Sequence, residues 1–99
     1  MDAVYISGPR ENVEDFAKRE LSLKQFDYNP INPIVFNEHM IKSKRMNLST
    51  ETLMKADLIA LLECRGISFL EGSENSDISN LERKIAEVCG IPTVKLQMF

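Results

Sequence analysis

Short apolar runs alternate with longer stretches of mixed polarity along the chain. Residues 3–7 (AVYIS) form a β-branched and aromatic run that ends at Gly8-Pro9, a pattern that predicts a strand followed by a turn. Residues 66–72 (GISFLEG) form an apolar run bounded by glycines, which is typical of a buried strand. Residues 91–96 (IPTVKL) predict a final strand. These runs together predict a sheet that joins distant parts of the chain.

The stretches between these runs have the period of amphipathic helices. The expected helices extend from Asn12 to about Phe26, over 36–45, from Ser49 or Thr50 to about Cys64, and from the end of the loop at 73–77 to Gly90. The apolar side of the first helix is expected to contain Val13, Phe16, Ala17 and Leu21. Asparagine, serine and threonine are favoured N-caps, and glycine commonly ends a helix, so these boundaries agree with the periodicity.

Two prolines three positions apart interrupt the segment 26–37 (FDYNPINPIVFN). Proline cannot donate a hydrogen bond within a sheet, so any strand here is short or lies at an edge. Strands that alternate with helices indicate right-handed βαβ units and a parallel sheet, the α/β fold class. In such sheets ligands bind beyond the carboxyl ends of the strands. This rule places a candidate site at the loop 7–12, the segment after Tyr28 and the loop 71–79.

The composition is that of an ordinary globular domain, and we expect one domain over residues 1–99. Of the 99 residues, 43% are hydrophobic and 27% are charged, which suits a single core. The net charge of −3 argues against a protein that binds nucleic acid polymers, because the phosphate backbone requires a basic surface. The short basic cluster at 42–45 (KSKR) is interpreted as a solvated surface.

The sequence also argues against a membrane, a disulfide and a metal. No apolar run approaches the roughly 20 residues of a membrane helix, and the first residues lack the positive charge of a signal peptide. We therefore expect a cytoplasmic protein. Cys64 and Cys89 form neither a disulfide framework nor a metal knuckle. The single histidine, His39, argues against a zinc site and is expected at the surface, so we predict no metal and no cofactor.

Asp57 lies near the middle of the apolar face of the helix expected at 49–64. That face contains Leu53, Met54, Ala60, Leu61 and Cys64. A carboxylate on a core-facing stripe is costly unless it is paired or hydrogen-bonded. Three interpretations stay open: residues 58–62 could form a strand that leaves Asp57 in a loop, Asp57 could cap a neighbouring element, or it could belong to a site.

Glu82 lies at the edge of the expected apolar face of the last helix. That face contains Ile78, Leu81, Ile85, Val88 and Cys89. The spacing Ser79-x-x-Glu82 matches a capping box, in which the glutamate reaches back to the N-cap amide. A half-buried carboxylate beside a ligand cleft is also what a glycosidic nucleophile needs. Cap and nucleophile both remain as hypotheses for Glu82.

Four stretches follow one another in an informative order and spacing. They are YISGP at 5–9, NP at 29–30, ADLIALLECRGISFLEG at 56–72, and the spacing from Ser76 to Glu82. Together they resemble the nucleoside 2-deoxyribosyltransferase-like family, which includes deoxynucleoside 5'-monophosphate N-hydrolases and small phage-type members. The resemblance spans nearly the whole chain. It implies a flavodoxin-like or Rossmann-like three-layer sandwich with a small, mostly parallel sheet of four or five strands.

The resemblance also implies roles for individual residues. Glu82 would be the nucleophile, Asp57 would support or protonate the leaving base, and Tyr5 would be the aromatic residue near the sugar. Ser76 stands where the monophosphate hydrolases have a phosphate-binding serine, so the substrate would carry a 5'-phosphate. The implied substrate-binding residues are Ser7, Gly8, Pro9, Arg10, Asn29 and Ser76.

The implied activity is cleavage or transfer at the base–sugar bond of a (deoxy)nucleoside 5'-monophosphate, through a covalent intermediate on Glu82. Such retaining chemistry places the two carboxyl groups about 5 Å apart. An alternative is a non-catalytic nucleotide-binding module of the same fold. The loop at 73–79 and the C-terminal end favour it, because the loop differs from the pattern of the resembling family and the C-terminal end is shorter than in that family. A third interpretation, a partner-binding protein, depends on the exposed segment 41–46 (IKSKRM). The apolar pair Met98-Phe99 predicts a homodimer.

Overall fold

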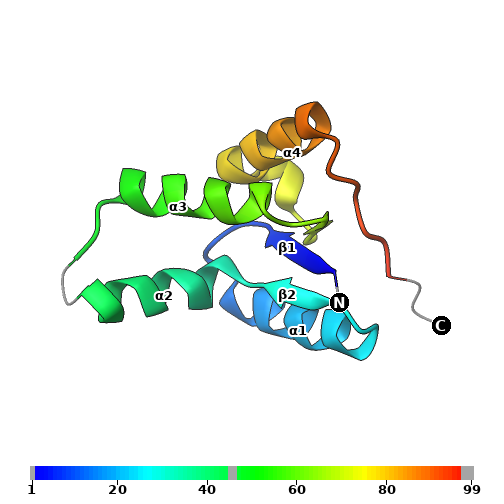
Figure 1. The fold of residues 1–99 in the computed structure, drawn as a ribbon, viewed down its shortest axis with the longest axis horizontal. Coiled ribbons are helices and arrows are strands. Elements are labelled where there is room, and N and C mark those ends of the chain that lie inside the picture. The colour runs from blue at the N-terminus through cyan, green and yellow to red at the C-terminus, as the bar shows by residue number, and fades with distance from the viewer. Residues whose placement is uncertain (1, 45–46, 97–99) are drawn as a thin grey trace.

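The computed structural model of the chain describes residues 2–44 and 47–96. Its parallel sheet has the strand order β2-β1-β3, with β1 at Ala3–Ser7, β2 at Asn29–Ile31 and β3 at Gly66–Phe69. Four α-helices surround the sheet: α1 (Val13–Gln25), α2 (Pro33–Lys44), α3 (Thr50–Leu62) and α4 (Asp77–Cys89), with a short 3-10 helix, η1, at Ser73–Asn75. The order of strands and helices in Figure 1 is that of an α/β, flavodoxin-like sandwich.

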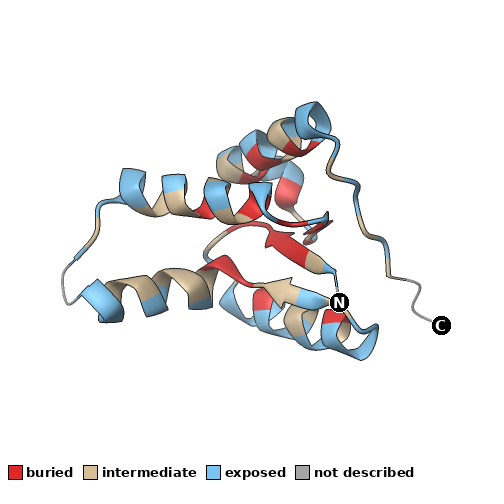
Figure 2. Cartoon of the chain, viewed as in Figure 1, coloured by how far each residue is buried: buried red, intermediate tan, exposed pale blue. Residues whose placement is uncertain are grey.

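The central strand β1 is the part of the sheet that both helix layers cover. Val4 and Ile6 face α1, where they pack with Phe16 and Leu23. Tyr5 points to the opposite face and packs with side chains of α3 and α4, including Leu61 and Ala86. The alternation follows from the pleat of a strand, which sends successive side chains to opposite faces. Figure 2 shows the resulting concentration of buried residues along β1.

The sheet is smaller than the four or five strands expected, with three strands among the described residues. The segment 91–96 does not form a strand but makes one isolated parallel bridge, between Ile67 and Thr93. The Ile67 amide donates to the Pro92 carbonyl, and the Val94 amide donates to the Ile67 carbonyl. Pro92 has no N–H to donate, so the ladder cannot continue through this position.

The core-facing side of α1 differs from the expected one. Phe16 and Leu23 are buried, whereas Val13 and Leu21 are 53% and 62% exposed. Arg19 lies between the two buried positions along the helix and donates to the Ser68 hydroxyl at 2.7 Å and to a backbone carbonyl of β3. A polar side chain with such partners can occupy the inner side of a helix, which hydrophobicity alone does not reveal.

The proline-rich segment forms a short edge strand and then a helix. Strand β2 has three residues and pairs with β1 alone, as the position of Pro30 predicts. Helix α2 begins at Pro33, three residues earlier than expected, because the Asn32 side chain accepts a hydrogen bond from the Ile34 amide at 3.0 Å. Asparagine at the cap followed by proline in the first turn is a favourable start for a helix.

Helices α2 and α3 extend side by side beyond the sheet, as Figure 1 shows. His39 is exposed on α2, as predicted. Residues 42–44 of the basic cluster are exposed too, whereas its last residue, Arg45, lies outside the described residues, as do Met46 and the pair Met98-Phe99. Over residues 2–44 and 47–96, no helix has the length and apolar character needed to cross a bilayer.

Candidate functional site

Glu82 lies in the interior, where two residues of β1 bind its carboxylate. The side chain is fully buried. The Tyr5 hydroxyl donates to Oε2 at 2.5 Å, and the Ser7 hydroxyl donates to Oε1 at 2.7 Å. Tyr5 and Ser7 are two positions apart on β1, so both side chains leave the same face of the sheet. A strand and a helix more than 70 residues apart in sequence therefore meet at this carboxylate.

The capping-box hypothesis for Glu82 is wrong. Helix α4 begins one turn earlier than that hypothesis requires: its N-cap is Ser76, whose hydroxyl accepts from the Ser79 amide at 3.3 Å. Glu82 therefore lies beyond the first turn of α4, and its carboxylate binds side chains of β1 instead of the N-cap amide.

The inner face of α4 is also shifted from the expected one. Ser79, Glu82 and Ala86 face the interior, whereas Leu81 and Val88 are 42% and 74% exposed. The small side chains of Ser79 and Ala86 let the helix approach the sheet, and the donors on β1 compensate the burial of Glu82.

Arg10 connects Glu82 with the second carboxylate of the site. One guanidinium nitrogen, Nη2, lies 2.9 Å from Glu82 Oε2, 3.0 Å from the Tyr5 hydroxyl and 3.5 Å from Asp57 Oδ2. The other terminal nitrogen donates to the Gly8 carbonyl at 2.9 Å. Both carboxylates therefore contact the same nitrogen atom, which brings the two acids predicted for catalysis into one cluster.

Asp57 is buried on α3 among these charges. The helix is continuous over Thr50–Leu62, so the interpretation of 58–62 as a strand is wrong. The side chain is 2% exposed, and its Oδ2 atom accepts from Asn37 Nδ2 at 3.4 Å as well as from Arg10. Burial raises the pKa of the Asp57 carboxyl to about 6, although the Arg10 charge and the Asn37 hydrogen bond oppose this shift. Asp57 can therefore gain or lose a proton near neutral pH.

Tyr5 stays protonated as a donor to Glu82. Burial, with the negative charge of Glu82 as the next cause, raises the pKa of the phenol well above its ordinary value. The hydroxyl is then a permanent donor in this cluster and positions the Glu82 carboxylate. Tyr5 has no exposed surface, so in the described state its contact is with the acid.

A cavity of about 340 Å³ adjoins the cluster. It is lined by Arg10, Asn37, Thr50, Leu53, Met54, Asp57 and Ile78. Glu82 does not line this cavity, because Arg10 and Tyr5 occupy the positions next to its carboxylate. The cavity thus combines apolar side chains from α3 and α4 with four polar side chains, those of Arg10, Asn37, Thr50 and Asp57.

The loop after β1 is packed tightly enough to fix Arg10. A Cβ atom on Gly8 would lie 2.7 to 3.0 Å from three side-chain atoms of Leu70, so glycine is required at this position. The Leu70 amide donates to the Ser7 carbonyl at 2.8 Å, which joins the end of β1 to the end of β3. The carboxyl ends of these two strands therefore form the rim on which the site is built.

Comparison with known protein families decides the relationship of the chain. A family model described as a domain of unknown function, DUF4406, matches residues 2–95. The chain is a member of the DUF4406 family. No curated protein and no solved structure matches it significantly. The family description assigns no activity, so the function of this DUF4406 domain is argued from its own side chains.

The structure of the DUF4406 domain brings most of the predicted site residues together. Tyr5, Ser7, Arg10, Asp57 and Glu82 form one connected cluster, and the backbone carbonyl of Gly8 binds Arg10. Pro9 lies in the same loop, with its ring 3.8 Å from the position of a Cβ on Gly72. These predicted residues therefore lie close together in the structure, and their roles in binding and catalysis stay predictions.

Two predicted substrate-binding residues are placed differently. Asn29 is exposed and pairs with Ala3 at the amino end of β1, whereas Ser7 is at the carboxyl end of that strand. Parallel pairing therefore puts Asn29 at the opposite end of the sheet from this cluster. Ser76 caps α4, so its hydroxyl already has a partner, the Ser79 amide.

Asn37 was missed by the sequence analysis. It lies on α2 and binds Asp57, and it lines the cavity. Its position on the helix is half-buried, near Ile34 and Met40 by helical spacing. An amide on the same side as such apolar residues is the signal that could have identified it, once the helix is known to begin at Pro33.

Among the residues that the structure describes, no group of three or more His, Cys, Asp or Glu side chains is arranged to hold a metal ion.

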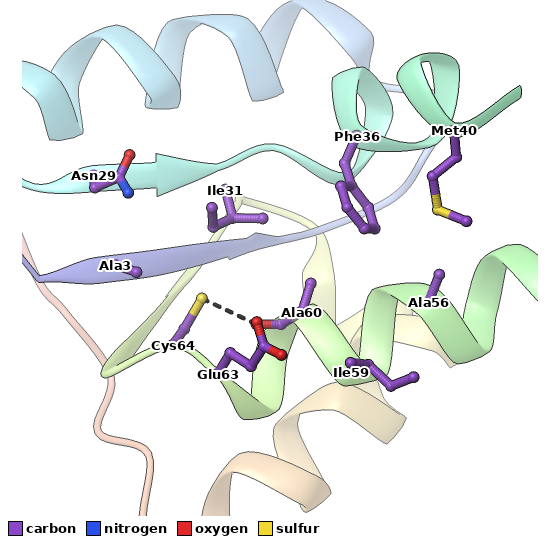
Figure 3. Close-up of a pocket in the computed structure, with 10 residues that line it drawn as sticks. All are labelled: Ala3, Asn29, Ile31, Phe36, Met40, Ala56, Ile59, Ala60, Glu63 and Cys64. Carbon is purple, nitrogen blue, oxygen red and sulfur yellow. Dashed lines mark hydrogen bonds between the residues drawn. The ribbon is translucent and has the colours of Figure 1, made fainter. Parts of the chain in front are cut away.

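A second, larger pocket of about 530 Å³ lies between β2, α2 and α3. Figure 3 shows its lining, with Phe36 and Met40 on one side and Ala60 and Cys64 on the other. The Cys64 thiol donates to the Ala60 carbonyl, and burial raises its pKa to about 11, so it remains a neutral thiol.

Proposed function

We infer that this DUF4406 domain is an N-glycosidase or deoxyribosyltransferase-type enzyme that cleaves the base–sugar bond of a (deoxy)nucleoside 5'-monophosphate. One observation supports the proposal most: the carboxylates of Glu82 and Asp57 share a nitrogen of Arg10 at the carboxyl edge of the sheet, beside a cavity. Two carboxyl groups in different environments are the machinery that glycosidic cleavage requires. The resemblance to the nucleoside 2-deoxyribosyltransferase-like family supports the same assignment.

In the proposed reaction, Glu82 and Asp57 divide the chemistry. A Glu82 oxygen attacks the anomeric carbon, the bond from that carbon to the base nitrogen breaks, and the bonding electrons go to the base. Asp57 in its protonated form gives its proton to the leaving base. A water molecule then attacks the same carbon, Glu82 leaves as a carboxylate, and Asp57 takes up a proton from the water. Each group thereby returns to its initial state.

Arg10 must change partners for this reaction to occur. Its Nη2 atom covers Oε2 of Glu82 in the described state. The 5'-phosphate of a bound nucleotide offers the guanidinium a doubly charged partner of the kind that arginine binds well. Arg10 also lines the cavity, and its side chain is 22% exposed, so a ligand can contact it. We propose that phosphate binding draws Arg10 away from Glu82 and so exposes the nucleophile.

The enclosure of Glu82 favours a second candidate function. A carboxylate with no exposed surface and three donors is also what a purely structural ion pair looks like. In that case the domain is a nucleotide-binding module without turnover, and the cavity beside Arg10 holds the ligand. The two candidates share the ligand and differ in whether the base is released.

Incubation of the purified protein with each deoxynucleoside 5'-monophosphate tests both candidates. Chromatography should detect free base, and Glu82→Gln should abolish its release while Glu87→Gln, an exposed acid on the same helix, should not. Base release that survives Glu82→Gln would refute the assigned nucleophile. Thermal stabilisation by a nucleotide without base release would favour the binding module. If no base is released and no nucleotide stabilises the protein, both candidates are excluded.

The proposal includes a cytoplasmic homodimer, because nucleoside monophosphates are cytoplasmic metabolites and α4 carries exposed apolar side chains. Leu81 and Val88 point away from the core, and a second copy packed on α4 would remove them from water. Light scattering after gel filtration should then give twice the mass of the chain. The double variant Leu81→Gln with Val88→Gln should be monomeric. A monomeric wild-type protein would contradict this part of the proposal.

A further inference from the structure

Three of the residues that line the cavity beside the cluster each have a buried polar atom without a partner. Arg10 Nε, Asn37 Oδ1 and Asp57 Oδ1 are buried and make no hydrogen bond within the described part of the chain. All three belong to residues that line the cavity of about 340 Å³. A buried polar atom without a partner costs about 1–3 kcal/mol, so such atoms gathered around one cavity indicate that a ligand supplies what is missing.

The chemical nature of the missing groups follows from the atoms. Asn37 must present its oxygen as the free end of the amide, because its Nδ2 donates to Asp57 Oδ2 and a reversed amide would set two oxygens against each other. Asp57 Oδ1 is a second acceptor when the carboxyl is ionised. Arg10 Nε is a donor in every state. The part of the ligand next to Asn37 and Asp57 must therefore bring hydrogen-bond donors for two oxygens, whereas the acceptor that Arg10 Nε needs is supplied by the 5'-phosphate of the proposed substrate.

An exocyclic amino group, which has two N–H donors, meets the requirement of the two oxygens. Cytosine and adenine carry such an amino group, whereas uracil and hypoxanthine carry a carbonyl oxygen in the same place. A carbonyl oxygen would leave Asn37 Oδ1 unpaired and facing another acceptor. In the remaining lining, Leu53, Met54 and Ile78 are apolar and suit the faces of a planar ring, and Thr50 adds one hydroxyl.

We propose that this cavity receives the nucleobase and that Asn37 selects bases with an exocyclic amino group. The inference rests on the proposed function, because it assumes that the ligand is a nucleotide, but it does not require that the nucleotide is cleaved. Asn37 acts on the base through its free oxygen and positions Asp57 through its amide nitrogen. It thereby couples recognition of the base to the acid assigned to the leaving group.

The test compares pairs of nucleotides that differ at this edge alone. Dissociation constants for deoxycytidine and deoxyuridine 5'-monophosphate, and for deoxyadenosine and deoxyinosine 5'-monophosphate, can be measured by calorimetry on the wild-type protein. The amino member of each pair should bind about tenfold more tightly, since a site built to hydrogen-bond one group rejects an analogue that lacks it. Asn37→Leu should remove this preference, whereas His39→Leu, an exposed position on the same helix, should retain it.

The outcomes separate this inference from the proposed enzyme. Equal affinity within each pair, or a preference that survives Asn37→Leu, overturns the role of Asn37 even if base is released. A preference for amino bases without base release supports the inference and refutes the enzyme. Failure of every nucleotide to bind overturns both. The comparison on the wild-type protein needs no variant, so it decides the matter even if Asn37→Leu does not fold.

Discussion

Two of the pockets on this domain differ in a way that size does not predict. The larger, of about 530 Å³, lies between β2, α2 and α3 and is lined mainly by apolar side chains such as those in Figure 3. The smaller, of about 340 Å³, lies next to two buried carboxylates and an arginine. Both are bordered by α3, which contributes Ala60 to one and Asp57 to the other.

The difference shows where the fold accepts an energetic cost. The larger pocket is explained by small side chains and a short edge strand, which leave space without burying any charge. Beside the smaller pocket, the carboxylates of Glu82 and Asp57 are kept out of water, and such burial is expensive unless each charge has partners. Because the fold buries charged groups beside the smaller pocket and not at the larger one, the functional site is expected at the smaller pocket. Four experiments test this contrast.

The largest effect is expected from removing the buried carboxylate. Glu82→Leu leaves Arg10 without its closest anionic partner, and loss of one member of a buried pair costs about 3–5 kcal/mol. Adding Arg10→Met should restore part of this loss, because no uncompensated charge then remains. Urea denaturation measures the free energy of unfolding. If Glu82→Leu is as stable as Glu87→Leu, an exposed position on the same helix, the carboxylate is not the centre of the cluster.

A smaller loss is expected from Tyr5→Phe. This substitution removes one hydroxyl that donates to a charged acceptor, a hydrogen bond worth about 2 kcal/mol. Base release should also fall, because Glu82 loses the group that positions it. Tyr28→Phe is a matched control, since Tyr28 is partly buried against the other core cluster and away from the acid. Equal denaturation midpoints for the two variants would contradict the role given to the Tyr5 hydroxyl.

Base release should depend on pH through Asp57. The folded-state pKa of about 6 lies above the ordinary value of 3.8, so the proton is held more tightly in the folded protein. The stability contributed by this group is present at low pH and is lost as the pH rises from about 4 through about 6. Protonation of the leaving base also requires the acid form, so the rate should fall about tenfold for each pH unit above 6. Asp57→Asn should flatten this profile, and a carboxyl titration followed by NMR locates the pKa directly.

The smallest effect is expected in the larger pocket. Ile59 lines it and is 60% exposed, so Ile59→Gln should change the free energy of unfolding by less than about 0.5 kcal/mol. Binding of a nucleotide and release of base should stay at the wild-type level. If Ile59→Gln lost nucleotide binding or base release, the site would instead be assigned to the larger pocket.

The sequence predicts the elements of this fold better than it predicts their inner faces. The strand at 3–7 and the cap at Gly90 follow from local chemistry, and the structure confirms them. The strand expected at 66–72 is confirmed over Gly66–Phe69, and of the two caps offered, Ser49 or Thr50, the structure has Ser49. The inner face of α4 could not be predicted, because hydrophobicity assigns Leu81 to the core and leaves Glu82 at its edge. Which of the two is buried depends on donors located on a distant strand.

The same limit applies to the candidate site. Glu82 and Asp57 could be named from their places on the expected helix faces and from the resemblance, and Tyr5 could be named from the resemblance alone. Asn37 was missed because the helix was expected to begin at residue 36, and its partner Asp57 lies on another helix, α3. The position of Asn29 at the opposite end of the sheet could not be predicted, because the motif around Pro30 gives the existence of an edge strand but not which of its ends adjoins the cluster.

Pro30, in the middle of β2, has a consequence for how copies of this protein can meet. An edge strand with a full row of unpaired amides can pair with a strand of another molecule, and such pairing leads to aggregation. Within the described residues β2 has no neighbour on its outer side, and the ring of Pro30 breaks its short row of amides. Self-association by growth of the sheet is thereby discouraged at this margin, and contacts between copies are left to the helices.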